Sequence, residues 1–120
     1  MISLQLPYPP SINNYWRHAR GRHYISAQGK AFRQEVWATA GTRPRMDGRL
    51  GVDVQVWVPD KRKRDLDNVL KALLDALEHA GIYKDDGQID DLHITRRGIE
   101  PGGQCRVQVW ELQDTWKRHI

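Results

Sequence analysis

The chain has 120 residues and a mass of 14.0 kDa, which fits one domain, since most domains contain about 100–150 residues. Hydrophobic residues make up 39% and charged residues 28%, a composition that excludes a disordered tail and a membrane-spanning protein. The first residues lack the basic and apolar regions of a secretory signal. A single cysteine, Cys105, excludes an intrachain disulfide and a multi-cysteine zinc site. We therefore expect one cytoplasmic domain over residues 1–120.

Positive charge is concentrated in the first part of the chain. Lys and Arg number 19 against 15 Asp and Glu, which gives a net charge of +4 and a pI near 9.5. Residues 1–49 contain eight of these cations and only two of the anions. Thirteen of the cations are arginine, whose planar guanidinium suits bidentate contact with phosphate. The charge distribution indicates an anionic polymer as partner, with solvated charge on a small soluble domain as the alternative.

Two regular elements are predicted in the first third of the chain. Residues 2–6 alternate apolar and polar side chains, which predicts a strand. Residues 9–21, rich in arginine and aromatic side chains, are expected to form a loop. Ser26 is a typical N-cap and predicts a helix over about 27–40. Its buried face is expected to carry Phe32, Val36 and Ala40.

The rest of the chain predicts three strands and a second helix. Residues 50–58 alternate regularly and predict a half-buried strand. A helix over about 66–80 ends at Gly81, a residue favoured just after helix ends. Two further strands, near 89–97 and 104–112, are joined by a Pro-Gly-Gly turn. The order β-α-β-α-β-β predicts an α+β domain with a mixed sheet and two main helices.

A basic run and an acidic pair lie side by side in the middle of the sequence. Four cations, Lys61-Arg62-Lys63-Arg64, precede Asp65-Leu66-Asp67-Asn68. In an extended segment the side chains of Asp65 and Asp67 point the same way, about 6–7 Å apart. Carboxylates so close repel unless a cation or proton lies between them, and hard oxygen ligands suit Mg²⁺ or Mn²⁺. The pair is a candidate metal site, with capping of the following helix by Asp65 as the alternative.

The helix after this pair has an apolar and a polar face. At about 100° per residue its apolar side chains fill an arc of roughly 200°, wider than a core-facing helix needs, so part of it is a candidate interface with a second copy. Lys71 shares the polar face with Asp67 and Asp75, each four residues away. This spacing indicates either ordinary salt bridges or a cation that stabilises phosphate charge beside a metal site.

A second acidic run, Asp85-Asp86-Gly87-Gln88-Ile89-Asp90-Asp91, follows the helix. It does not fit a calcium loop, because the twelfth position falls on Arg96 or Arg97 where a bidentate Glu is needed. A turn that returns Asp85 or Asp86 to the N-terminal end of the helix is the better interpretation. Three carboxylates and a lysine beside a basic strip are typical of a metal-dependent phosphodiester nuclease.

Several short segments form a specific pattern when they are taken together. They are Leu6-Pro7-x-Pro9-Pro10-Ser11-x-Asn13, Trp16-Arg17, Ser26-Ala27-x-Gly29, Phe32-Arg33, Arg62-x-Arg64-Asp65-Leu66-Asp67-Asn68, Lys71, Asp75-Ala76-Leu77, Ala80-Gly81 and Asp85-Asp86. This pattern resembles the RusA family of Holliday junction resolvases, small homodimeric endonucleases that cut four-way DNA junctions. The resemblance covers nearly the whole chain. Only the C-terminal segment 116–120 has no counterpart in it.

The resemblance implies which side chains act in catalysis. It implies that Asp65, Asp67 and Asp86 bind Mg²⁺, with Mn²⁺ as an alternative, and that Lys71 is the catalytic lysine. It thus selects Asp86 over Asp85, a choice that the spacing left open. It also implies a RusA-like fold, a homodimer, a phage or bacterial origin and a role in DNA recombination and repair.

The predicted function is a metal-dependent, structure-selective endodeoxyribonuclease that resolves four-way junctions by paired nicks, one from each protomer of a two-fold dimer. Basic side chains would contact backbone phosphates, which position the DNA without reading its sequence. The predicted DNA-binding residues are Arg17, Arg20, Arg22, Lys61, Arg62, Lys63 and Arg64. The alternatives are a catalytically inactive junction-binding relative and a nuclease selective for flaps or forks.

Other conspicuous side chains receive structural interpretations. The five histidines lack the spacing of metal ligands and are expected at the surface or against DNA. Cys105 alternates with valines and is expected in the core. Tyr15 and Trp16 are expected to anchor a loop, with stacking on unpaired bases as the alternative. Asn13 and Asn14 are candidates both for DNA contact and for capping that loop.

Overall fold

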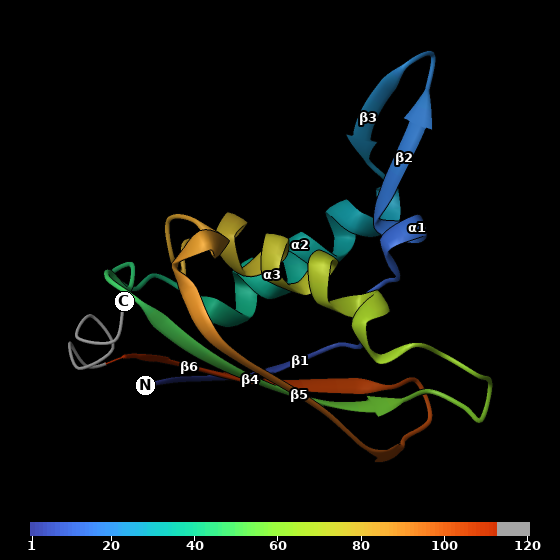
Figure 1. Ribbon diagram of the computed structural model, residues 1–120. Coiled ribbons are helices and arrows are strands. Elements are labelled where there is room, and N and C mark those ends of the chain that lie inside the picture. The colour runs from blue at the N-terminus through green and yellow to red at the C-terminus, as the bar shows by residue number, and fades with distance from the viewer. Residues whose placement is uncertain (113–120) are drawn as a thin grey trace.

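A four-stranded mixed sheet forms the base of the molecule in the computed structural model, which describes residues 1–112 (Figure 1). The strand order is β1-β6-β4-β5. β4 runs parallel to β5 and antiparallel to β6, which pairs antiparallel with β1. The strands are β1 (Ile2–Leu6), β4 (Leu50–Val58), β5 (Ile89–Ile99) and β6 (Gln104–Glu111). The predicted α+β class with a mixed sheet is confirmed.

The helices pack on one face of this sheet, as Figure 1 shows. They are α1 (Ile12–Tyr15), α2 (Ala27–Ala40), α3 (Leu70–His79) and the short 3-10 helices η1 (Leu66–Val69) and η2 (Asp86–Gln88). Alternation along β4 turns Val52, Val54 and Val56 into the core, and fully burying such a side chain contributes about 1.5–3 kcal/mol. No helix in the described part of the chain is long and apolar enough to cross a membrane.

The predicted helix at 27–40 forms with the predicted bounds. The hydroxyl of Ser26 accepts a hydrogen bond from the Gly29 N–H at 2.9 Å and donates one to the Asn14 carbonyl at 2.5 Å. A Cβ at Gly29 would lie 2.5 Å from the Tyr15 carbonyl oxygen, so only glycine allows α2 to approach α1 so closely. Ser26 and Gly29 together hold α1 against the N-terminal end of α2.

The expectation of a loop over residues 9–21 is wrong for most of its length. Residues 12–15 form α1, and β2 (Trp16–Ala19) pairs with β3 (Arg22–Ile25) in a hairpin. Arg20 and Gly21 at its tip have φ of 52° and 74°, as a two-residue hairpin turn requires. The hairpin extends away from the body of the molecule (Figure 1). Its side chains are mostly exposed, so no apolar alternation marks these strands in the sequence.

The predicted second helix is divided into η1 and α3. Gly81 has φ 81° and its N–H donates to the Glu78 carbonyl, so the predicted helix end is confirmed. Most of the apolar arc of α3 packs in the chain's own core, while Leu70 and Leu74 are half-buried. The predicted core position of Cys105 is confirmed, and burial raises the pKa of its thiol to about 12.

Candidate active site

The basic run after β4 folds around the carboxylate of Asp60, which was not predicted as a site residue. The guanidinium groups of Arg62 and Arg64 donate to the Asp60 carboxylate at 3.0 and 2.8 Å. Hydrogen bonds from Arg64 and Arg62 hold the pKa of Asp60 well below its usual range. The Arg62 side chain nevertheless remains 82% exposed, and Lys61 and Lys63 are exposed as well. The run therefore keeps a cationic surface while one carboxylate fixes its shape.

Asp65 and Asp67 lie at the start of η1 with their side chains exposed. The neighbouring Val69 is buried and Leu66 is half-buried, so packing of these apolar side chains directs the carboxylates toward solvent. Asp65 occupies the N-cap position of η1 but makes no capping hydrogen bond with its side chain. The capping role considered for Asp65 is thus not observed.

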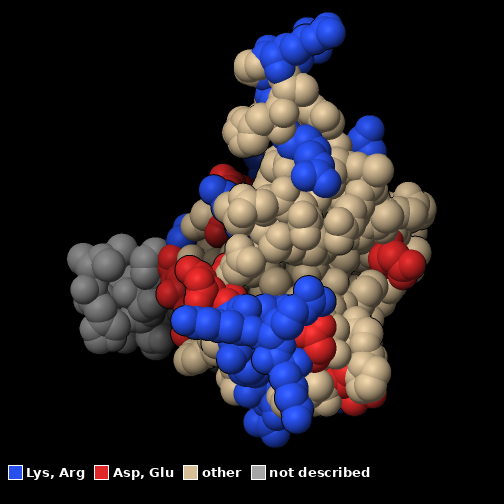
Figure 2. Space-filling view, turned by 90° about the vertical axis from the view of Figure 1, so that its right-hand side faces the viewer, with Lys and Arg blue, Asp and Glu red and all other residues tan. Residues whose placement is uncertain are grey.

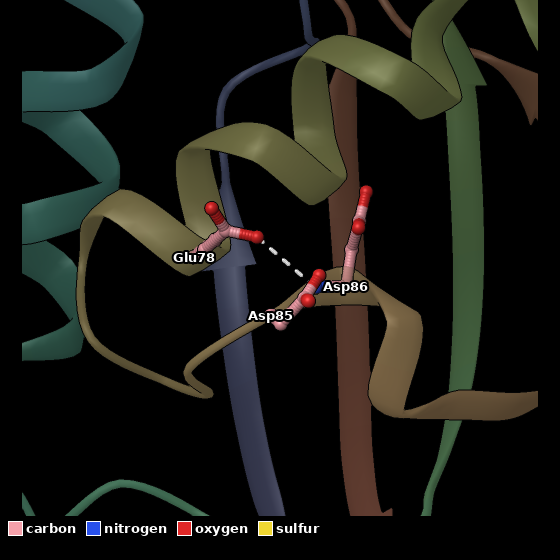
Figure 3. Close-up of side chains that lie close together, drawn as sticks. All are labelled: Glu78, Asp85 and Asp86. Atoms are coloured by element: carbon pink, nitrogen blue, oxygen red, sulfur yellow. Dashed lines mark hydrogen bonds between the residues drawn. The ribbon is translucent and has the colours of Figure 1, made fainter.

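A close group of three carboxylates lies where η2 meets α3 (Figure 3). One carboxylate oxygen from each of Glu78, Asp85 and Asp86 lies within 4.8 Å of the others. The Asp86 N–H donates to Glu78 Oε1 at 3.0 Å. Partial burial and then the neighbouring Asp85 carboxyl raise the pKa of Asp86, while the charge of Lys71 opposes this rise. Glu78 was not predicted as part of the site, although it follows Lys71 by seven residues on the same face of α3.

The Gln88 side chain holds this acidic turn in place. Its Oε1 accepts hydrogen bonds from the Lys84 and Asp85 N–H groups at 2.9 and 3.0 Å. Its Nε2 donates to the carbonyls of Met46 and Gly48 at 3.1 and 2.9 Å. All the hydrogen bonds that this amide group readily forms are therefore made. The spacing Asp85-x-x-Gln88 has the form of a capping box, which is the signal that could have identified Gln88 from the sequence.

Asp75, on the polar face of α3, pairs with a residue of α2. Arg33 Nη2 lies 2.7 Å from Asp75 Oδ2, and the buried Tyr15 hydroxyl also donates to that carboxylate. Arg33 Nε in turn donates to the Tyr15 hydroxyl at 2.7 Å. Burial and the bond to Asp75 raise the pKa of Tyr15. The expected anchoring role of Tyr15 is confirmed, because this network ties α1 and α2 to α3.

Lys71 is left without an ion pair among the described residues, because Asp75 is engaged by Arg33. The salt bridges considered for Lys71 do not form. Its ammonium is exposed and acts electrostatically on Asp86. The structure thus brings Lys71 and Asp86 within electrostatic reach. Asp65 and Asp67 are not members of the close carboxylate group that contains Asp86.

The predicted DNA-binding side chains form two separate basic groups. The first group consists of Arg17, Arg20 and Arg22, which are exposed on the hairpin. The second group is the 61–64 run, which follows β4. In Figure 2 the hairpin extends at the top, and the larger basic group lies in the lower half beside acidic side chains. Both groups are visible in this one view, with a largely uncharged surface between them.

Comparison with known proteins identifies the family of this chain. A sequence profile of the family described as endodeoxyribonuclease RusA matches residues 7–109. The chain belongs to the RusA family.

Its relatives match along nearly their whole length. The chain is 44% identical over 112 residues to a crossover junction endodeoxyribonuclease of Enterobacteria phage HK97, covering 90% of this chain and 92% of the relative. Identity to the crossover junction endodeoxyribonuclease RusA of Escherichia coli K12 is 40% over 114 residues, covering 92% and 94%. The crossover junction endodeoxyribonuclease of Enterobacteria phage 82 is also 40% identical, over 113 residues. Phage and bacterial proteins are thus both among the relatives.

Proposed function

We propose that this protein is a crossover junction endodeoxyribonuclease that cuts four-way DNA junctions in recombination and repair. Membership of the RusA family and the match over nine-tenths of the chain support this proposal. The observation that carries it is the close carboxylate group that contains Asp86, together with Lys71, which forms no ion pair among the described residues and lies within electrostatic reach of Asp86. The carboxylates would attract a metal cation, and Lys71 would attract a phosphate group.

The donor chemistry of the site fits a hard divalent cation. Its candidate ligands are carboxylate oxygens, which Mg²⁺ and Mn²⁺ prefer, and no arginine among residues 1–112 forms an ion pair with the carboxylate group that contains Asp86. We propose that Asp65, Asp67 and Asp86 bind Mg²⁺, with Mn²⁺ able to replace it. A cation bound there supplies a water of lowered pKa and neutralises charge on the phosphate.

The chain's own side chains complete the proposed mechanism. The Lys71 ammonium stabilises the negative charge that develops on the scissile phosphate. Because Arg33 neutralises the Asp75 carboxylate, one helical turn from Lys71, the Lys71 ammonium remains free to interact with the phosphate. The hairpin arginines and the 61–64 run contact backbone phosphates on either side of the cut, so junction binding weakens steeply with added salt.

Paired nicks require two active sites, and we propose that a two-fold dimer supplies them. The half-buried Leu70 and Leu74 on α3 are candidates for this interface. Sedimentation of the full chain with and without junction DNA tests the dimer. A monomer on the junction would contradict it.

The decisive experiment is cleavage of an end-labelled mobile four-way junction with Mg²⁺. The wild-type chain is expected to nick opposed strands symmetrically, and Asp67→Asn to bind the junction without nicking it. Asp47→Asn is the matched control, because the Asp47 side chain is exposed and forms no hydrogen bond or ion pair among the described residues. Wild-type binding without nicking would support the inactive-relative alternative. Equal cutting of flaps or forks would contradict selectivity for junctions.

A further inference from the structure

A hollow of 420 Å³ opens beside the proposed metal ligand Asp65. Its walls come from four separate parts of the chain: the segment after β1 together with α1, the start of α2, the turn after β4 with η1, and the turn between β5 and β6. The volume lies within the range of small-molecule pockets, which is about 300–1,000 Å³. One nucleotide fits a space of this size, whereas a base pair within a duplex does not.

Three side-chain amides on the walls have no hydrogen-bond partner among the described residues. They belong to Asn14 on α1, Gln28 on α2 and Asn68 on η1. Asparagine and glutamine carry both donors and acceptors, which match the edges of nucleic-acid bases. The amides on α1 and α2 line the same hollow as the metal-site segment. The arrangement offers hydrogen bonds to a ligand that presents donors and acceptors together.

The remaining walls suit the flat face of a base and a phosphate group. Tyr8 and the prolines at positions 9, 10 and 59 supply flat apolar surface, on which a base can stack. Arg62 and Arg64 also line the hollow, and arginine binds phosphate in a planar geometry. A Cβ at Gly103 would lie 2.7 Å from the Tyr8 Cβ, so the tyrosine is packed closely against the β5–β6 turn. This packing holds the tyrosine wall of the hollow in place.

We propose that this hollow binds one unstacked nucleotide of the cleaved strand, next to the scissile phosphate, and that Asn14 and Gln28 contact its base. The inference rests on the proposed nuclease function, since Asp65 connects the hollow to the site of cutting. Extruding a base costs a few kcal/mol in a duplex and least where pairing is already disturbed. Strands exchange at the centre of a four-way junction, so the hollow favours branched DNA over an uninterrupted duplex.

An abasic scan of the junction tests this pocket. Each nucleotide within three positions of the cut is replaced in turn by an abasic analogue, and cleavage is measured with the wild-type chain and with the double variant Asn14→Ala/Gln28→Ala. The wild-type rate is expected to fall about tenfold or more at one abasic position, the effect of losing a specific base contact. The double variant is expected to cut the unmodified junction more slowly by a similar factor and to show no further loss at that position.

The chain offers a matched control for the substitution on α2. Gln34 lies on α2 with Gln28 and is exposed like it, but does not line the hollow. Gln34→Ala is expected to behave as the wild type at every abasic position. The proposal is overturned if no single position affects the wild-type chain, or if the double variant keeps the full abasic effect.

Binding of the same junctions without metal separates this proposal from the proposed function. Wild-type affinity is expected to fall at the abasic position that slows cleavage, and the affinity of the double variant is expected not to fall there. If the wild-type chain cuts no junction but shows this pattern of affinities, the nuclease function fails and the nucleotide pocket stands. Uniform affinities across the scan would overturn the pocket even if cutting occurs.

Discussion

Asp60, which precedes α3, and Asp86, which follows it, are in opposite electrostatic environments. In the turn before the helix, Asp60 is bonded by Arg62 and Arg64, and its pKa is lowered. In the turn after the helix, Asp86 lies against other carboxylates, and its pKa is raised. The first carboxylate is neutralised by the chain itself, whereas the second group retains negative charge that a bound cation would neutralise. Sequence position alone does not distinguish these two environments.

The difference separates structural carboxylates from candidate ligands. Asp60 shapes the basic run, and Asp75 ties α3 to α2 through Arg33. Asp86 has no arginine partner among the described residues, and its N–H is held by Glu78. A carboxylate without an arginine partner, in a turn that hydrogen bonds hold in place, is able to bind a metal ion.

The largest effect is expected for Asp86→Asn. Loss of this carboxylate removes a proposed metal ligand, so junction cleavage should fall on the order of 100-fold or more, while junction binding without metal persists. Gel-based cleavage and binding assays measure the two effects. Asp60→Asn is the matched variant in the other turn and should retain most of the cleavage rate. Equal losses in the two variants would remove the distinction between the turns.

The next effect is on stability and concerns the pair between α2 and α3. Arg33→Met leaves the part-buried Asp75 carboxylate without its guanidinium, so the free energy of unfolding should fall by about 2 kcal/mol. Urea denaturation followed by circular dichroism measures this change. Arg45 is exposed and its side chain forms no hydrogen bond or ion pair among the described residues, so Arg45→Met should change stability by less than about 0.5 kcal/mol. Equal values for the two variants would contradict a stabilising role for the pair.

A smaller effect is expected from loosening the turn that carries Asp86. Gln88→Met preserves the approximate size of the side chain and removes its four hydrogen bonds. The Lys84 and Asp85 amides should exchange with solvent about tenfold faster, and cleavage should fall by a similar factor. Hydrogen-exchange NMR and the junction assay measure the two changes, with Gln34→Met as the control. Faster exchange without slower cleavage would restrict Gln88 to a structural role.

The smallest change is in the titration of the two carboxyl groups. As pH falls, Asp86 should protonate above the ordinary carboxyl pKa and Asp60 below it. The bonds to Asp60 therefore stabilise the fold above the ordinary pKa and are lost as pH falls through its lowered value. Ionisation of Asp86 has the opposite sign, because it disfavours the fold as pH rises through its raised value. Carboxyl-detected NMR titration measures both midpoints, and the reverse order would contradict the comparison.

Local sequence patterns were sufficient for the elements that face the core. The strand at 50–58 and the helix at 27–40 form with their predicted bounds, since burial of one face imposes a regular apolar spacing. The hairpin at 16–25 was missed, because its exposed side chains carry no such spacing. Glu78 was missed as a site residue, because a single acidic side chain on a helix is normally only solvated.

The sequence by itself determined the fold class, the family and the candidate residues Asp65, Asp67, Lys71 and Asp86, because apolar periodicity and motif spacing are properties of neighbouring positions. Only the tertiary structure decided which charges are neutralised. Arg33 and Asp75 lie 42 positions apart, as do Gln88 and Met46, and the hollow beside Asp65 is assembled from four separate segments. Charge pairing and cavity shape depend on distances in space, which chain folding sets and residue order does not display.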